Sequence, residues 1–116
     1  MAADLEGADT SAVEESRKPD PRSVLLVDDS REIRQVLRVL FENNGFEVVG
    51  EADSGVGVVE MVLQRNPAFV ILDMRMPDLS GEQTAQAIRR SAPDTHIVAF
   101  SAFLEEQPEW ADAFLN

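Results

Sequence analysis

The stretch AFVILDMRMPD, residues 68–78, decides the fold. Five apolar residues run into an acid, Asp73, and the chain then breaks into a loop that contains Pro77. An apolar run without alternation is typical of a strand that is buried on both faces of a parallel sheet. Asp73 is then either a loop or helix-cap residue, or a group that the fold carries to the end of a strand for chemistry.

Short apolar runs and helical patterns alternate on both sides of this strand. The runs 24–27, 46–52 and 96–102 predict three further strands. A helix is predicted to follow the cap residue Ser30 and to end at the NNG of residues 43–45, because apolar residues recur there at helical spacing. These residues are Ile33, Val36, Leu37, Leu40 and Phe41.

Two more helices are predicted, over 54–64 and 80–90. The first is weakened by Gly55 and Gly57, each of which costs about 1 kcal/mol relative to alanine. Ser80 and Gln83 suggest a capping box at the start of the second. The order strand-helix-strand-helix-strand-helix-strand with short connections predicts a doubly wound α/β fold over residues 23–116.

Composition limits the classes of function. Residues 1–22 are acidic and poor in large apolar side chains, which predicts a disordered tail and no secretory signal. The formal net charge of −12 disfavours nucleic-acid binding and favours divalent cations or basic partners, although the acidity could serve solubility alone. The chain has no cysteine and no apolar run near the ~20 residues of a membrane span, so we expect a cytoplasmic protein.

Acids follow two of the predicted strands. Asp28 and Asp29 come after the first and Asp73 ends the third, while a hydroxyl residue, Ser101, lies in the fourth. The carboxyl ends of parallel strands meet at one edge of the sheet, so these side chains should lie close together. Clustered carboxylates repel one another unless a cation neutralises them, and oxygen ligands select a hard ion such as Mg²⁺. Each acid alone would be interpreted as a helix cap.

Three stretches resemble one family. VLLVDDSREIRQVL, VILDMRMPDLSG and HIVAFSA are similar to the receiver domains of bacterial two-component response regulators of the chemotaxis-regulator type, with the acid pair, D-x-x-M-P and Ser-Ala in the family's order. The resemblance runs from about Val24 to the end of the chain. It implies a flavodoxin-like parallel sheet with strand order 2-1-3-4-5 and a phosphorylation-dependent signalling switch rather than an enzyme.

The resemblance also implies a role for each matching residue. Asp73 would accept a phosphoryl group from a sensor histidine kinase or a phosphotransfer protein. Asp29 would bind Mg²⁺ directly, Asp28 mainly through water, and the backbone carbonyl of Arg75 would complete the metal site together with Asp73. Ser101 would bond a phosphoryl oxygen and draw its loop inward as the switch. The output partner is not implied by any of these residues.

The sequence departs from the family after Ser101. Pro108 argues for a shortened or irregular fourth helix, and ADAFLN resembles the fifth strand with Phe114 at the aromatic switch position. The chain stops where the family's Lys and last helix are expected, so it is either truncated or an atypical receiver. Lys18 and Arg75 are weak substitutes for that Lys. In either case exposed apolar surface on strands 4 and 5 should invite a partner or self-association.

Some features have two interpretations. GVGVVE, residues 55–60, is a tolerated helix start rather than a dinucleotide loop, because it follows the second strand and lacks the third glycine. His96 starts the fourth strand, away from the acids. Arg31, Arg34 and Arg38 form a stripe that is either a solvated helix face or, as in the family, a docking surface for the kinase.

Two rival functions remain open from the sequence. The first is a receiver-like interaction module that works without phosphorylation, which the missing Lys favours and the retained acids disfavour. The second is an aspartate-nucleophile phosphohydrolase resembling the haloacid dehalogenase type. That class places an acid two residues after the nucleophile, and this chain has Arg75 there.

Overall fold

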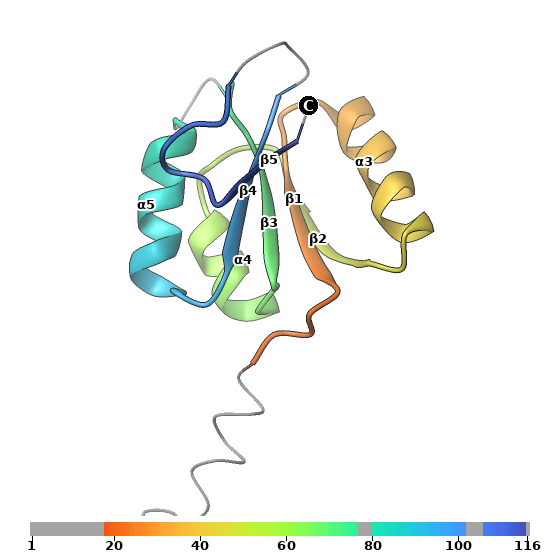
Figure 1. The fold of residues 1–116 in the computed structure, drawn as a ribbon, viewed down its shortest axis with the longest axis horizontal. Coiled ribbons are helices and arrows are strands. Elements are labelled where there is room, and N and C mark those ends of the chain that lie inside the picture. Colours follow the sequence, from red (N-terminus) through yellow and green to blue (C-terminus); the bar gives the residue numbers. More distant parts are fainter. Residues whose placement is uncertain (1–17, 77–79, 102–105, 116) are drawn as a thin grey trace, which may run out of the picture.

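A computed structural model describes residues 18–76, 80–101 and 106–115 of the 116-residue chain. These residues form a five-stranded sheet with helices on both faces (Figure 1). In chain order the elements are β1 (Ser23–Val27), α3 (Arg31–Asn43), β2 (Glu47–Ala52), α4 (Val58–Arg65), β3 (Phe69–Asp73), α5 (Gly81–Ser91), β4 (His96–Phe100) and β5 (Ala113–Leu115). No helix in this part of the chain has the length and apolar character of a membrane span.

The sheet is parallel throughout, with strand order β2-β1-β3-β4-β5. This confirms the predicted doubly wound fold and its strand order. From β1 the chain first moves outward to β2 and then returns to β3 on the other side of β1. The carboxyl ends of β1 and β3 therefore stand at the point where the strand order reverses, which is where ligands bind in sheets of this kind.

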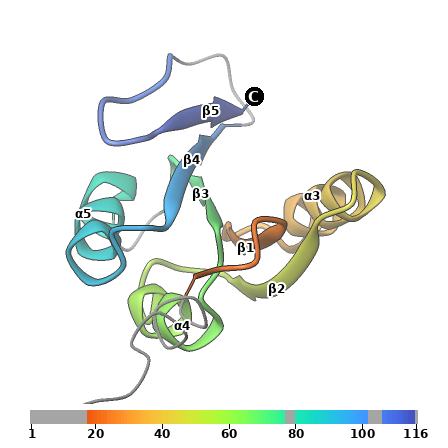
Figure 2. The ribbon, with the colours of Figure 1, turned by 60° about the horizontal axis from the view of Figure 1, so that its bottom comes forward.

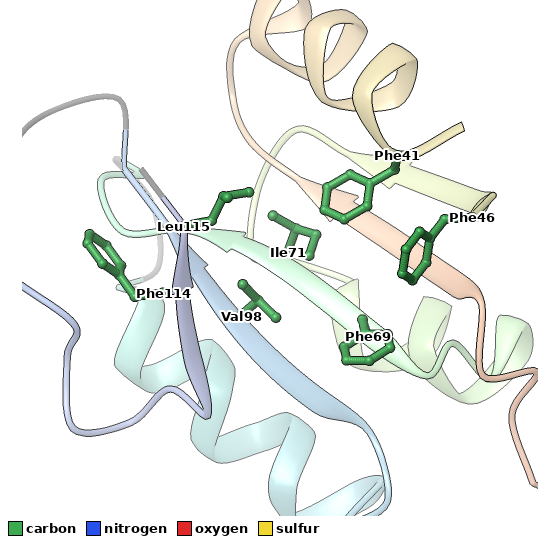
Figure 3. A pocket seen from close by; sticks show the side chains of 7 residues that line it. All are labelled: Phe41, Phe46, Phe69, Ile71, Val98, Phe114 and Leu115. Atoms are coloured by element: carbon green, nitrogen blue, oxygen red, sulfur yellow. The ribbon is translucent and has the colours of Figure 1, made fainter. Parts of the chain in front are cut away.

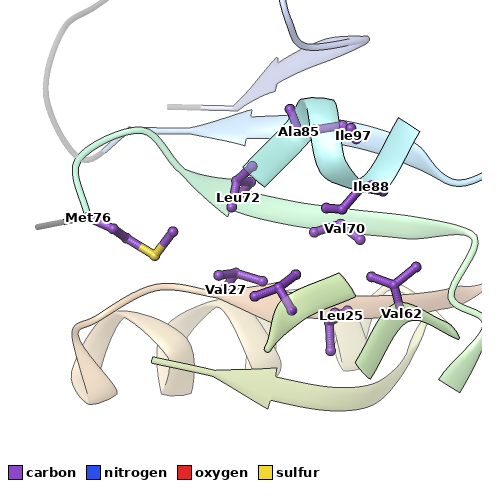
Figure 4. Packing of buried hydrophobic residues seen from close by; sticks show 10 residues of the cluster. Leu25, Val27, Val62, Val70, Leu72, Met76, Ala85, Ile88 and Ile97 are labelled. Carbon is purple, nitrogen blue, oxygen red and sulfur yellow. The ribbon is translucent and has the colours of Figure 1, made fainter. Parts of the chain in front are cut away.

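The helices divide between the two faces of the sheet. α4 and α5 lie together on one face, and α3 lies on the other (Figure 2). Ten buried residues form the core between α4, α5 and the face that they cover, here called the closed face (Figure 4). They are Leu25, Val27, Val58, Val62, Val70, Leu72, Met76, Ala85, Ile88 and Ile97. Each fully buried large aliphatic side chain contributes about 1.5–3 kcal/mol of transfer free energy.

Among the described residues, α3 is the only helix on the opposite face, here called the open face. Its buried cluster is smaller, namely Val24, Leu26, Leu37 and Ile71. Beyond α3 a groove of about 210 Å³ runs toward β5 (Figure 3). Seven apolar side chains line the groove: Phe41, Phe46, Phe69, Ile71, Val98, Phe114 and Leu115.

The buried stripe of α3 is narrower than predicted. Leu37 is buried, and Ile33 and Phe41, four residues away on either side, are half-buried against the same cluster. Val36 and Leu40 were expected on this stripe, but their exposed fractions are 65% and 46%. A single helix meets a sheet along one line, and no second helix lies beside α3 in the described part of the chain, so side chains one position off that line face solvent.

The predicted start of the second helix is wrong. α4 begins at Val58 and not at residue 54, because Gly57 takes the left-handed conformation with φ of 81°. A residue in this conformation interrupts the helical backbone, and glycine adopts it at little cost. The predicted strand 96–102 is also too long, since β4 ends at Phe100.

Cap residues fix two other helix starts as predicted. The Ser30 hydroxyl accepts from the Ile33 N–H at the start of α3, at 3.2 Å. Ser80 and Gln83 form the expected capping box at the start of α5. After α3, Gly45 lies in the left-handed region with φ of 83°, as the NNG pattern predicted.

The segment before β5 contains no helix over residues 106–112. Arg89 of α5 anchors this segment by donating to the Trp110 carbonyl at 2.7 Å and to the Asp112 carboxylate at 3.2 Å. The predicted fifth strand is confirmed at Ala113–Leu115. Predictions for residues 1–17, for Pro77 and for residues 102–105, where the fourth helix would begin, fall outside the described residues.

Candidate functional site

The predicted acids meet at the carboxyl edge of the sheet. Asp28 directly follows β1, and Asp73 is the last residue of β3. One carboxylate oxygen from each of Asp28, Asp29 and Asp73 lies within 4.8 Å of the other two. Residues 45 positions apart in sequence therefore share one site because their strands are parallel neighbours.

A pocket of about 250 Å³ opens over these acids. Its lining is Asp28, Asp29, Ser30, Ile33, Asp73, Arg75 and Phe100. Asp28 and Asp73 are 3% and 9% exposed, whereas Asp29 is exposed to solvent. The site thus has two sheltered carboxylates at its floor and one that faces incoming ligands.

Local turns orient the two sheltered carboxylates. The Ser30 N–H donates to Asp28 Oδ1 at 2.8 Å, and the Arg75 N–H donates to Asp73 Oδ1 at 2.9 Å. In both cases an aspartate bonds the backbone two residues on, which holds the side chain in one direction. The tight turn after Asp73 also explains why the apolar run breaks at this residue.

The electrostatics of the site favour a bound cation. The pKa of Asp28 is raised to about 6, mainly by burial and also by the neighbouring charges of Asp73 and Asp29, against the opposing hydrogen bond from Ser30. Burial also raises the pKa of Asp73, with the charge of Asp29 acting in the same direction. Ionising three adjacent carboxylates without a counter-charge costs free energy, and a divalent cation offsets that cost.

The donor set fits Mg²⁺. It consists of carboxylate oxygens, with no sulfur or imidazole among the pocket-lining residues. Mg²⁺ prefers one or two carboxylates with water and phosphate oxygens completing its shell. The exposed Asp29 and the sheltered Asp28 and Asp73 leave the pocket side open for those ligands.

Ser101 lies beside the site without lining its pocket. It directly follows Phe100, the residue that pairs with Asp73 across β3 and β4. Its side chain is buried, and its N–H donates to the Leu115 carbonyl at 3.1 Å. The side chain of Phe100 occupies the pocket wall instead. Phe114, expected at an aromatic switch position, lines the apolar groove.

The sequence suggested Lys18 and Arg75 as weak substitutes for the family's Lys. Arg75 lines the acid pocket, so this suggestion agrees with its position. The suggestion for Lys18 is wrong, because Lys18 lies beside Ala68, Phe69 and His96 at the amino ends of β3 and β4. His96 occupies the same end of the sheet, where its ring contacts Phe69.

Two arginines of the α3 stripe, Arg34 and Arg38, bond an acid of β2, which the sequence did not predict, and a docking role for the stripe stays a prediction. Arg34 is 14% exposed and bonds Glu51 of β2 and the backbone carbonyl of Asp28. Arg38 also bonds Glu51. Sequence reasoning missed this link to the loop after β1 that carries Asp28 and Asp29, here called the acid loop. The signal for it was weak, namely arginines at positions 34 and 38 and a single acid near the end of the second strand.

Comparison with known proteins agrees with this geometry. Residues 24–113 match the response regulator receiver domain family. The chemotaxis protein CheY of Bacillus subtilis is 33% identical over 79 residues, which cover 68% of this chain and 66% of CheY. A protein-glutamate methylesterase/protein-glutamine glutaminase of Hahella chejuensis is 35% identical over 80 residues, covering 69% of this chain and 23% of that protein. This chain therefore spans less than two thirds of either relative.

Solved structures show the same fold. The response regulator TrrA from Thermotoga maritima, in complex with Mg(2+)-BeF, superposes with a TM-score of 0.72 at 28% identity, covering 81% of this chain and 84% of TrrA. TrrA in complex with the histidine kinase ThkA gives a TM-score of 0.70 with the same identity and coverage.

Proposed function

The chain belongs to the response regulator receiver domain family, and on this premise we propose that it is a signalling switch that accepts a phosphoryl group on Asp73 with Mg²⁺ as cofactor. The observation that carries the proposal is the meeting of Asp28, Asp29 and Asp73 within 4.8 Å at the carboxyl edge. Neither rival function accounts for this cluster as well. An interaction module needs no buried acids. A phosphohydrolase of the type considered would need an acid at position 75, where this chain has arginine.

In the proposed reaction Asp73 is the nucleophile. A carboxylate oxygen of Asp73 forms a bond to phosphorus, the bond between phosphorus and the donor's nitrogen or oxygen breaks, and the donor leaves with that electron pair. Bound Mg²⁺ would neutralise charge on the phosphoryl oxygens and on the acids. The turn through the Arg75 N–H holds the Asp73 carboxylate in a single direction for attack.

The remaining residues have supporting roles in this proposal. Asp29 and Asp28 would hold the metal, directly and mainly through water respectively, and the Arg75 carbonyl would complete its shell. Ser101 would bond a phosphoryl oxygen after transfer. Because its side chain is buried and its N–H is bonded to Leu115, this step requires the end of β4 to move, which would pass the signal to β5.

The proposed phosphoryl donor is a sensor histidine kinase or a phosphotransfer protein in the cytoplasm. TrrA, which has the same fold, has been solved bound to the kinase ThkA. In this chain α3 follows the loop of Asp28 and Asp29, and its exposed aliphatic residues, Val36, Val39 and Leu40, offer a docking surface. The output partner would be another protein or domain.

Self-association through the open face is a further part of the proposal. Val98, Phe114 and Leu115 of β4 and β5 line the apolar groove together with the phenylalanines near α3. Such a surface favours a partner that removes it from water. Light scattering behind size-exclusion chromatography should show a mass that rises with concentration, and Val98→Asp should abolish the rise. A constant monomer mass would contradict self-association.

Intact-mass spectrometry tests the function. Incubation with acetyl phosphate and Mg²⁺ should add one phosphoryl group to the chain, and EDTA or Asp73→Asn should prevent the addition. Asp94→Asn, which changes an acid at the other end of the sheet, is the matched control and should be phosphorylated normally. An adduct that survives in Asp73→Asn, or no adduct in the wild type, would overturn the proposal.

A further inference from the structure

Arg34 joins three parts of the fold with one side chain. It belongs to α3, and its Nη1 donates to the Asp28 carbonyl at 2.6 Å while its Nε donates to Glu51 Oε1 at 3.0 Å. Asp28 begins the loop after β1, and Glu51 lies in β2. The side chains of Arg34 and Glu51 are 14% and 29% exposed, so these bonds are less screened by water than those of a fully exposed ion pair.

Glu51 is a fixed anchor for this guanidinium. Arg38 donates to the other carboxylate oxygen of Glu51 from Nε at 2.9 Å and from Nη2 at 2.5 Å. The hydrogen bond from Arg38, and after it that from Arg34, holds the pKa of Glu51 below its usual range against the effect of burial. Glu51 therefore stays charged at neutral pH, and its position fixes that of Arg34.

The bond to the Asp28 carbonyl acts on the metal-binding acids. This carbonyl and the Asp29 N–H belong to one planar peptide unit, so a donor that holds the oxygen fixes the plane between the two residues. The Asp28 N–H is already bonded to the Ala52 carbonyl at 3.0 Å, and Asp28 Oδ1 accepts from Ser30. The bond from Arg34 adds to these two, so the peptide units on both sides of the Asp28 Cα are held. The direction in which the Asp29 side chain points from the loop is set as a result.

We propose that Arg34 is a positioning residue for the Mg²⁺ site, acting through the Asp28 carbonyl to set the relative directions of the Asp28 and Asp29 carboxylates. The inference rests on the proposed function, because it requires that these acids bind Mg²⁺. Glu51 serves as the brace that keeps the Arg34 guanidinium in place.

Replacing Arg34 distinguishes a positioning role from a purely electrostatic role, because the two roles change the Mg²⁺ affinity in opposite directions. Arg34 is positive and lies beside a cation site, so its electrostatic effect alone opposes Mg²⁺ binding. Removing the charge would then tighten binding. Removing the constraint on the peptide plane has the opposite effect, because the two carboxylates must then be ordered when the metal binds.

The test is the dissociation constant for Mg²⁺, measured by isothermal titration calorimetry on the whole chain. Arg34→Gln should weaken Mg²⁺ binding on the order of tenfold, the scale seen when a group that orients metal ligands is removed. Arg34→Lys keeps the charge but loses the two-pronged geometry, so it should also weaken binding. Thermal unfolding without Mg²⁺ gives the loss of stability in each variant.

Arg89→Gln is the matched control. Like Arg34, Arg89 donates to one backbone carbonyl and one carboxylate, those of Trp110 and Asp112, but it lies in the last turn of α5. It should lower the melting temperature while leaving the dissociation constant for Mg²⁺ within about twofold, because it does not touch the acid loop. A weakening in Arg89→Gln equal to that in Arg34→Gln would show a general loss of stability and overturn the proposal.

Other outcomes also decide the matter. Unchanged or tighter Mg²⁺ binding in Arg34→Gln, or wild-type binding in Arg34→Lys, would overturn positioning by Arg34. If Arg34→Gln does not fold, Arg34→Lys carries the same test. A wild-type chain that binds no Mg²⁺ would instead refute the proposed function, so the two failures are distinguishable.

Discussion

Burial has opposite effects on the stability of the fold at the closed face and at the carboxyl edge of the same sheet. On the closed face ten apolar residues are buried between α4, α5 and the sheet, so burial stabilises the fold (Figure 4). At the carboxyl edge burial acts on Asp28 and Asp73, where it raises the pKa of each and opposes folding once they ionise. The two regions lie only a few residues apart on β1 and β3.

The difference shows that packing on the closed face holds the residues of the acid site in place. Leu72, on the closed face, is the residue before Asp73, and Val27 is the residue before Asp28. These buried side chains hold the strand ends in register, so the acids cannot move apart to relieve their repulsion. The carboxylates of this site therefore repel one another in the folded state, and a bound cation would offset that repulsion.

The largest expected effect is a cavity on the closed face. Ile88→Ala should lower the free energy of unfolding by about 2–5 kcal/mol, because Ile88 is fully buried between α5 and the sheet. Urea denaturation measures the change. Val39→Ala on α3 is the control, since this side chain is 57% exposed and its loss should cost no more than about 0.5 kcal/mol. Equal losses would show that the closed face is not the main source of stability.

A smaller effect of opposite sign is expected at the carboxyl edge. The pKa of Asp28 is raised to about 6 in the fold from 3.8, so between these values the native state holds a proton that the unfolded state has released. Stability from this group is therefore full below about pH 4 and is lost as the pH rises through 6. Asp28→Asn in EDTA should gain on the order of 1–2 kcal/mol at pH 7.5, after allowance for solvent screening.

The gain of Asp28→Asn should vanish near pH 4, where the native carboxyl is protonated. The asparagine can still accept the Ser30 hydrogen bond, so the comparison isolates the charge. Asp53→Asn, an exposed change, should be neutral to within about 0.5 kcal/mol at both pH values. A loss of stability at pH 7.5 in Asp28→Asn would contradict the claim that burial of this carboxylate opposes folding.

The smallest expected effect is at Gly81, where the two regions meet. A Cβ at Gly81 would stand 2.7 Å from Trp110 Cζ2 and 3.6 Å from the Asp73 carbonyl. Gly81→Ala should therefore displace the half-buried indole and shift the emission of this single tryptophan to longer wavelength, with a loss of stability of about 1 kcal/mol, the low end for overpacking. Glu82→Ala, an exposed change one residue on, should leave the emission unchanged.

Strand positions and the acid site were predictable for physical reasons. Central strands of a parallel sheet are buried on both faces, so β1 and β3 appear as continuous apolar runs. The ends of such strands meet at one edge, so the sequence alone predicts that Asp28, Asp29 and Asp73 lie together. Their chemical roles, and those of Ser101 and Arg75, stay predictions.

Other features depend on geometry that periodicity does not encode. The exposure of Val36 and Leu40 follows from the absence of a second helix beside α3 among the described residues. The late start of α4 follows from one backbone angle at Gly57. The bridge from Arg34 to Glu51 spans 17 residues and requires the exact placement of two side chains, so a pattern of arginines could not reveal it.

The most direct test of the account is the free energy of unfolding at pH 7.5 with and without Mg²⁺, for the wild type and for Asp29→Asn. The account predicts that Mg²⁺ stabilises the wild type in proportion to its binding, by about 2.7 kcal/mol at one hundred times the dissociation constant. Asp29→Asn should show little of this gain. Equal responses to Mg²⁺ in both proteins, or none in the wild type, would contradict the claim that the carboxyl edge is built to hold a cation beside Asp73.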